Sequence, residues 1–298
     1  MLGLIAGNGR FPLLVVQQAA LKGTPLTIAA IREEADPAIE EFADGKIQVH
    51  WLGLGRLGRL LKTFKKAGVD QAMMCGQVKH VRIFARDGRP AAGRLSALPD
   101  LKMLRVLLSL PRKNTVSLIG AFVDVLEKEG IQMIDSTTLV PHLLPEPGVL
   151  TKRSPDAEEQ KDIDYGLTVA RRIAELDVGQ TVVVKDQAVV AVEAMEGTDE
   201  TIRRAAQLAE GRRLTVVKVS RPQQDMRFDV PVLGLSTLKV LGECRVSALA
   251  MEAGKTLLLD RVDLIRQADE MKLAWLAVED GEFHAKPQRR KEEREEKK

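Results

Sequence analysis

The fold of the first half of the chain is decided by the stretch Leu2-Gly3-Leu4-Ile5-Ala6-Gly7-Asn8-Gly9-Arg10-Phe11-Pro12. Its apolar start predicts a β-strand over residues 2–6, and the periodic apolar residues beyond it predict a helix over residues 13–21. Gly7 and Gly9 allow a turn in which backbone N–H groups approach a phosphate at the helix N-terminus. Pro12 stands where a third glycine would complete the dinucleotide-binding pattern. The stretch is therefore compatible with a nucleotide contact or with a plain tight turn.

Strands and helices alternate outward from this stretch. We expect strands over residues 26–31, 47–51, 69–75 and 131–134, and helices over residues 57–67, 100–110 and 115–129. This alternation is typical of a doubly wound parallel sheet, so we predict a Rossmann-like α/β domain over residues 1–138.

A proline-rich segment divides the chain. Residues 141–148 contain three prolines and one glycine, which can continue neither a helix nor a central strand, so we predict a hinge-like linker over residues 139–152. Residues 153–282 again mix helices and strands, with a hairpin expected at 181–194, and predict a second α/β domain.

Composition sets limits on the class of protein. Among 298 residues, 45% are hydrophobic and 29% are charged, which is the mixture of a globular protein. The two cysteines, Cys75 and Cys244, exclude a disulfide framework and fit a reducing cytoplasm. The apolar N-terminus lacks the basic start of a signal peptide, and every apolar run is much shorter than the ~20 residues of a membrane span. Aromatic residues make up only 3%, which argues against a surface that stacks nucleic-acid bases.

The net charge of +3 comes from the C-terminus. Residues 286–298 hold seven basic and four acidic residues, which leaves 38 of each sign in the rest of the chain. We expect residues 283–298 to be a disordered charged tail, with a weak electrostatic contact to anionic lipid or nucleic acid as an open alternative.

Two further motifs carry candidate chemistry. The first places Glu193, Glu196 and Asp199 around a glycine turn. Such carboxylates could bind Mg²⁺. Equally, they could stabilise a helix N-terminus and pair with an arginine. The second is a polar loop after a strand, where pyrophosphate chemistry would find cations for phosphate oxygens and carboxylates for a metal and a water. Its charged residues are Lys218, Arg221, Asp225, Arg227 and Asp229.

These motifs together resemble the LpxI-type UDP-2,3-diacylglucosamine pyrophosphatases. The resemblance rests on Leu4-Ile5-Ala6-Gly7-Asn8-Gly9-x-x-Pro12, Gly76-Gln77-Val78, Glu193-Ala194-x-Glu196-Gly197-Thr198-Asp199 and Gln224-x-x-Arg227-x-Asp229-x-Pro231, and it covers the chain except for the tail. It implies a cytoplasmic enzyme of lipid A biosynthesis that uses Mg²⁺ or Mn²⁺ and water to cleave UDP-2,3-diacylglucosamine into UMP and 2,3-diacylglucosamine 1-phosphate. It also implies that Asp229 is essential.

The candidate site residues follow from these motifs. We expect catalytic roles for Asp229, Asp225, Arg227 and Lys218. We expect metal ligands among Asp229, Glu193, Glu196 and Asp199. We expect substrate contacts from Gly7, Asn8, Gly9, Pro12, Gly76, Gln77, Val78, Gly197, Thr198 and Gln224.

The expected partners and the alternative functions complete the prediction. The partners we expect are the lipid substrate, its two products and a second copy of the chain in a homodimer, without nucleic acid. We also expect the acyl chains to lie between the two domains, because a chain without a membrane span has to enclose them itself.

Two alternative functions remain. A nucleotide-dependent oxidoreductase would need the complete glycine pattern, and a non-catalytic nucleotide- or lipid-binding protein would leave the charged loop unexplained.

Overall fold

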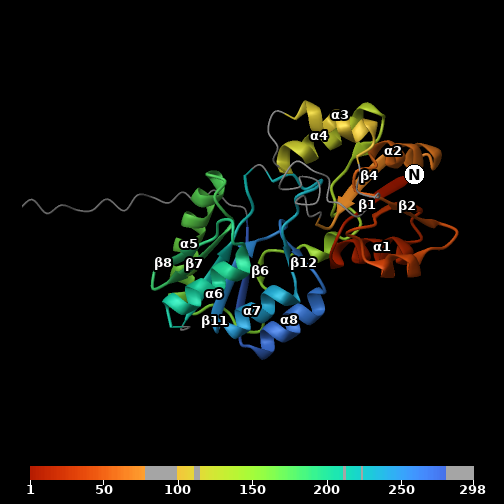
Figure 1. The fold of residues 1–298 in the computed structure, drawn as a ribbon. Helices are drawn as coiled ribbons and strands as arrows, with labels where there is room; N and C mark the ends of the chain where they lie inside the picture. The colour runs from red at the N-terminus through yellow and green to blue at the C-terminus, as the bar shows by residue number, and fades with distance from the viewer. Residues whose placement is uncertain (78–98, 111–114, 211–212, 223, 280–298) are drawn as a thin grey trace, which may run out of the picture.

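The computed structural model describes residues 1–77, 99–110, 115–210, 213–222 and 224–279. It has two α/β domains, as the sequence predicts (Figure 1). The predicted charged tail lies outside the described residues.

The N-terminal domain is built on a five-stranded parallel sheet. Its strands are β1 (Leu2–Ala6), β2 (Leu26–Ile31), β3 (Ile47–Leu52), β4 (Gln71–Cys75) and β5 (Gln132–Met133). They lie in the order β3-β2-β1-β4-β5. The order reverses between β1 and β4, and in open parallel sheets the carboxyl ends of the strands at such a point form the usual ligand crevice.

Helices cover both faces of this sheet because both faces of its strands are apolar. Leu4 and Ala6 pack against α1 (Arg10–Lys22) and the 3₁₀ helix η1 (Pro37–Phe42). Ile5, between them in β1, points to the other face. That face is covered by α2 (Leu57–Lys66), α3 (Leu101–Ser109) and α4 (Thr115–Lys128).

The C-terminal domain is built on a mixed six-stranded sheet. Its strands are β6 (Gly148–Val149), β7 (Thr181–Lys185), β8 (Ala188–Val192), β9 (Leu214–Lys218), β11 (Val246–Glu252) and β13 (Ala274–Val278). They lie in the order β6-β13-β11-β9-β7-β8; β9, β11 and β13 run parallel, and the other pairings are antiparallel. The predicted hairpin is β7 and β8.

Four helices enclose the second sheet. One face is covered by α5 (Ala157–Glu175), which begins with a capping box between Asp156 and Glu159. The other face is covered by α6 (Thr198–Leu208), α7 (Leu235–Glu243) and α8 (Arg261–Glu270).

Segments of the C-terminal domain and of the linker also pack on the N-terminal domain. The short strands β10 (Val232–Leu233) and β12 (Leu257–Leu258) pair in parallel. Leu257 and Val230 join the apolar core around α1, which belongs to the N-terminal domain. Leu143, in the 3₁₀ helix η4 (Pro141–Leu143) of the linker, packs into the same core. The domain limits themselves stay predictions.

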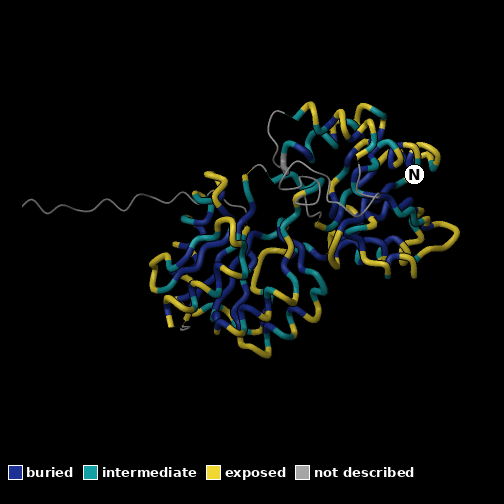
Figure 2. The backbone as a smooth tube through the Cα atoms, in the orientation of Figure 1, coloured by how far each residue is buried: buried dark blue, intermediate teal, exposed yellow. Residues whose placement is uncertain are grey.

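No helix within the described part of the chain is long and apolar enough to cross a membrane. Figure 2 shows that the buried backbone lies along the two sheets, while exposed residues mark the outer helices and turns.

Candidate functional site

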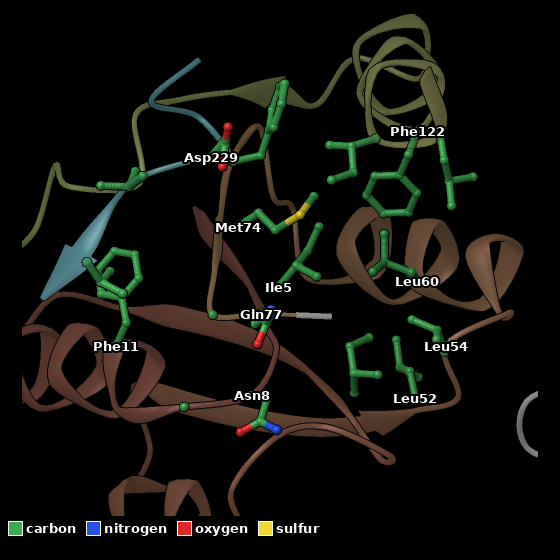
Figure 3. Close-up of a pocket in the computed structure, with 18 of the residues that line it drawn as sticks. Ile5, Asn8, Phe11, Leu52, Leu54, Leu60, Met74, Gln77, Phe122 and Asp229 are labelled. Atoms are coloured by element: carbon green, nitrogen blue, oxygen red, sulfur yellow. The ribbon is translucent and has the colours of Figure 1, made fainter. Parts of the chain in front are cut away.

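A cavity of about 770 Å³ lies where the two domains meet. It opens at the carboxyl ends of β1 to β4, beside the reversal of strand order, and the C-terminal domain closes it with Phe228, Asp229, Val230 and Ser236. This volume is in the usual range for a site that binds a small molecule. Figure 3 shows Asp229 on one side of the hollow and Asn8 and Gln77 on another.

Close backbone contact between two turns forms the floor of the cavity. The N–H of Asn8 donates to the carbonyl of Gln77 over 2.8 Å, and the N–H of Gln77 donates to the carbonyl of Asn8 over 2.9 Å. Gly76 has a φ of +86°, and a Cβ there would lie 2.5 Å from the carbonyl oxygen of Asn8 and 2.8 Å from Pro12 Cγ. The glycine is therefore required by both its conformation and the space around it.

The same floor presents a helix N-terminus to the cavity. Gly9 precedes α1 with a φ of +100°, and no side chain caps this helix. A Cβ on Gly9 would meet nothing within 4 Å, so there is room beside the first N–H groups of α1. Uncapped N–H groups at the start of a helix favour an anion.

Most of the cavity wall is apolar. Side chains from the N-terminal sheet and from α2 to α4 line it, among them Ile5, Leu52, Leu54, Leu57, Leu60, Met74, Met103, Leu118, Ile119 and Phe122. Figure 3 shows Leu52, Leu54, Leu60 and Phe122 gathered on the side away from Asn8. The arrangement suits a ligand with a long apolar part and a polar head.

The loop that carries Asp229 is held by the N-terminal domain. Ser136 is fully buried after β5. Its Oγ lies 2.7 Å from the carbonyl oxygen of Arg227 and 2.6 Å from that of Met74, and its N–H donates to the carbonyl of Met226 over 3.0 Å. Arg227 reaches Glu127 of α4 over 2.9 Å. The loop is thus anchored to both domains.

Asp225 and Arg227 form a local pair inside this loop. Arg227 donates to the Asp225 carboxylate through Nε at 3.0 Å and Nη2 at 2.8 Å, and its N–H donates over 3.0 Å. These hydrogen bonds from Arg227 lower the pKa of Asp225 below its ordinary range. Asp225 therefore holds the loop in shape as a charged acceptor.

Asp229 has looser surroundings. It lines the cavity, its side chain is 52% exposed, and its nearest cation is Arg221 Nη1, 3.4 Å away. Gln224 donates to its backbone carbonyl and accepts from the N–H of Arg221 over 3.1 Å. Asp229 is thus a positioned carboxylate that faces the cavity with spare acceptor capacity.

Lys218 lies in a separate cluster at the start of α6. Its Nζ donates to Thr198 Oγ1 over 2.9 Å, and Thr198 donates to Glu193 over 3.0 Å. Burial lowers the pKa of the Lys218 ammonium, while the charges of Glu193 and Asp199 act in the opposite direction. Lys218, Gly197 and Thr198 lie outside the cavity lining.

The expected metal ligands have other partners. Glu196 pairs with Arg204 at 2.6 Å, and Asp199 accepts from Thr237 Oγ1 over 2.8 Å. The described residues contain no group of three or more His, Cys, Asp or Glu side chains placed to hold a metal ion. Glu193, Glu196 and Asp199 lie outside the cavity lining, whereas Asp229 belongs to it.

The predicted substrate contacts divide in a similar way. Asn8, Gly9, Gly76 and Gln77 line the cavity, whereas Gly7, Pro12 and Gln224 support those residues or the Asp229 loop from behind. Val78 lies outside the described residues.

Sequence reasoning missed the residues that join the domains. Ser136 and Glu127 hold the Asp229 loop from 91 and 100 residues away along the chain, and Arg10 pairs with Asp260 at 3.2 Å. The position of Ser136 at the carboxyl end of the last parallel strand was the available signal, because such ends surround ligand sites.

Comparison with known sequences places the chain. A sequence model of the LpxI N-terminal domain matches residues 1–143, and one of the LpxI C-terminal domain matches residues 146–276. The chain belongs to the LpxI family. A relative from Caulobacter vibrioides, named UDP-2,3-diacylglucosamine pyrophosphatase LpxI, is 34% identical over 288 residues, which span 93% of this chain and 97% of the relative.

Two solved structures of biotin carboxylases show a distant likeness to this chain. A biotin carboxylase domain from Hydrogenobacter thermophilus matches at 13% identity and a TM-score of 0.25, over 70% of this chain and 41% of that one. A biotin carboxylase from Campylobacter jejuni matches at 11% identity and a TM-score of 0.26, over 70% and 42%. These values carry no argument about the site.

Proposed function

We propose that this chain hydrolyses the pyrophosphate of UDP-2,3-diacylglucosamine to UMP and 2,3-diacylglucosamine 1-phosphate, a step of lipid A biosynthesis. The observation that carries the proposal is the cavity between the domains, which joins an apolar wall to a polar end at Asp229 in a chain of the LpxI family. The name of the Caulobacter vibrioides relative supplies the substrate.

The acyl chains would occupy the apolar wall. Leu52, Leu60 and Phe122 offer a surface removed from water, and burial of each CH₂ contributes about 0.8 kcal/mol. The expectation that the acyl chains lie between the domains therefore remains part of the proposal.

The polar head would lie across the floor and the Asp229 loop. The uncapped start of α1 at Gly9 offers N–H groups to phosphate oxygens, and Asn8 and Gln77 offer carboxamides. Ser236 lines the cavity beside the start of α7, which also lacks a side-chain cap.

Asp229 would be the catalytic carboxylate. It would orient the attacking water and accept a proton from it. The water oxygen would bond to one phosphorus while the bond from that phosphorus to the bridging oxygen breaks, and the bridging oxygen would leave with the other phosphate. Arg221 would fix the direction of the Asp229 side chain, and the pair of Asp225 and Arg227 would fix its loop. Lys218, which lies outside the cavity lining, would act as a positioning residue: it would hold Thr198 at the start of α6.

A divalent cation is the proposed cofactor, with Asp229 as its protein ligand. Mg²⁺ commonly binds through one or two carboxylates together with substrate phosphates and water, so a cage of three protein carboxylates is not required. Mg²⁺ or Mn²⁺ would neutralise charge on the pyrophosphate.

Incubation of the purified chain with UDP-2,3-diacylglucosamine in detergent, followed by mass analysis of the products, tests the function. We expect UMP and the 1-phosphorylated lipid, in equal amounts. Isotopic water would label the phosphate that is attacked. Release of UDP, or no reaction with any divalent ion, would contradict the proposal.

Removal of metal provides the next test. EDTA should abolish hydrolysis, and excess Mg²⁺ or Mn²⁺ should restore it, because the Asp229 carboxylate is itself negative and the charge on the two phosphates would be offset by the cation. Full activity in EDTA would eliminate the cation from the mechanism and leave the reaction itself in place.

The remaining expectations belong to this proposal as well. A homodimer, a cytoplasmic location and peripheral contact with the inner membrane fit an enzyme that takes a lipid substrate.

A further inference from the structure

Helix α3 exposes a stripe of leucines. Leu101 is 75% exposed, Leu104 is 42% exposed and Leu108 is 77% exposed. Positions i, i+3 and i+7 lie on one side of a helix, so the three side chains form a continuous apolar strip. Met103 and Val106, on the opposite side of α3, are buried in the core.

The surface around this strip is basic. Helices α2 and α3 pack against each other and carry six exposed basic residues and no acidic residue: Arg59, Lys62, Lys65, Lys66, Lys102 and Arg105. Glu129 pairs with Lys65 and Lys102. Since the chain without its last 13 residues has equal numbers of basic and acidic residues, this is a local concentration of charge.

The inner faces of the same two helices line the cavity. Leu57 and Leu60 of α2 and Met103 of α3 are part of the apolar wall. In the view of Figure 1, α2 and α3 lie at the outer end of the N-terminal domain, and Figure 2 marks exposed residues along them. One pair of helices therefore separates the cavity from a surface that is both apolar and basic.

We propose that the α2–α3 face, consisting of Leu101, Leu104 and Leu108 with the six basic residues above, docks onto a bilayer surface that contains anionic lipids. The leucines would enter the boundary between headgroups and acyl chains, and the lysines and arginines would contact the anionic headgroups. This combination fits a bilayer better than a second copy of the chain, because two such faces would bring like charges together. The inference rests on the proposed function in one respect: a lipid substrate gives the chain a reason to dock on a bilayer.

Co-sedimentation of the full chain with vesicles tests the docking surface. The probes are phosphatidylcholine vesicles with and without 30 mol% phosphatidylglycerol, in the absence of substrate. We expect binding to the anionic vesicles that weakens as salt is raised, because the headgroup contacts are screened.

Two double variants with matched exposure locate the surface. Leu101→Gln with Leu108→Gln removes the ends of the strip; the control, Leu21→Gln with Leu208→Gln, changes leucines that are 75% and 66% exposed on α1 and α6. The first pair should lower the bound fraction about five-fold or more, since each lost leucine removes buried apolar area, and the control should leave it unchanged. Every variant keeps the charged C-terminus, so any contribution from that segment is the same in all.

A variant with fewer basic residues tests the contribution of charge independently. Lys62→Gln, Lys66→Gln and Arg105→Gln together should reduce binding to anionic vesicles. The same number of changes at Arg172, Arg203 and Lys239, which lie on α5, α6 and α7, should have little effect.

Several results would overturn the proposal. They are no binding by the unaltered chain, equal loss in the α3 pair and its control, or a dimer in solution that the α3 pair converts to monomer, which would assign the face to a second copy. Hydrolysis of detergent-dispersed substrate is measured in parallel and should be unchanged in the α3 pair. If the unaltered chain fails to hydrolyse the substrate, the proposed function is contradicted. If the unaltered chain hydrolyses the substrate but fails to bind vesicles, the docking surface is contradicted.

Discussion

Two aspartates four residues apart have different surroundings, and this separates their roles. Asp225 is bound by three nitrogen donors of Arg227, whereas Asp229 is half exposed on the cavity wall with Arg221 at 3.4 Å. A carboxylate whose hydrogen bonds are already made has little capacity for a water or a cation. Asp229 keeps that capacity, and so the chemistry is assigned to it.

The pair of Asp225 and Arg227 predicts a pH dependence of stability. Because hydrogen bonds from Arg227 lower the pKa of Asp225 in the folded chain, the pair stabilises the fold above the unfolded pKa and loses this effect as pH falls through the folded pKa. Asp225→Asn should therefore unfold at lower urea than the unaltered chain at pH 7, and the difference should shrink toward pH 3. Asp164→Asn, on the exposed side of α5, controls for loss of one charge. A difference that grows toward pH 3 would contradict the pairing.

At the scale of elements, the turn between β1 and α1 and the end of β4 form one unit through Gly76. A side chain at a positive φ costs about 1–2 kcal/mol by itself. Gly130, which ends α4 with a φ of +84°, has no atom within 4 Å of a Cβ, so Gly130→Ala should show this cost alone.

Gly76→Ala should be more costly and should weaken substrate binding. Its Cβ would lie 2.5 Å from the carbonyl oxygen of Asn8 and would push the cavity floor apart. Urea unfolding of both variants and the KM for the nucleotide lipid check the prediction. Equal loss of stability in the two variants would mean that the close contact at Gly76 does not constrain the site.

Most elements could be predicted from the sequence because their patterns are local. The strand over residues 2–6, the helix over residues 57–67 and the hairpin at 181–194 follow from periodicity and turn residues. The two-residue strands β6 and β10 could not be predicted, because only their partners β13 and β12 define them.

Part of the site could also be predicted from local sequence patterns. Asn8, Gly76 and Asp229 follow strand ends or lie in a polar loop, and all three line the cavity. Glu193, Glu196 and Asp199 are close in sequence, but spacing does not determine where a side chain points, and each of them has a partner nearby.

For the whole molecule, the central feature is an interface that holds the Asp229 loop against the N-terminal domain. Ser136, Glu127 and the pair of Arg10 and Asp260 connect the two domains around the cavity. The polar end of the cavity therefore depends on both domains, and neither domain by itself contains the whole site.

Ser136→Ala tests this dependence. It removes the buried hydroxyl that lies between the carbonyl oxygens of Met74 and Arg227, and it should cost about 1–3 kcal/mol of stability and lower kcat. Ser109→Ala removes a hydroxyl that bonds within α3 at Val106, 2.9 Å away, and should cost less and leave kcat unchanged. Equal kcat values for Ser136→Ala and Ser109→Ala would show that the interface does not position the loop.

The assignment of the chemistry to Asp229 is tested most directly by a comparison of two aspartates that share one arginine. Arg221 contacts Asp229 over 3.4 Å and Asp177, which is 78% exposed and lies outside the cavity lining, over 2.7 Å. Asp229→Asn should lower kcat by about 100-fold or more, the typical contribution of a positioned proton acceptor, with substrate binding and melting temperature nearly unchanged. Asp177→Asn should keep kcat within about three-fold, since Asp177 lies outside the cavity lining and its change leaves Arg221 beside Asp229. Near-normal hydrolysis by Asp229→Asn, or equal losses in both variants, would contradict the account.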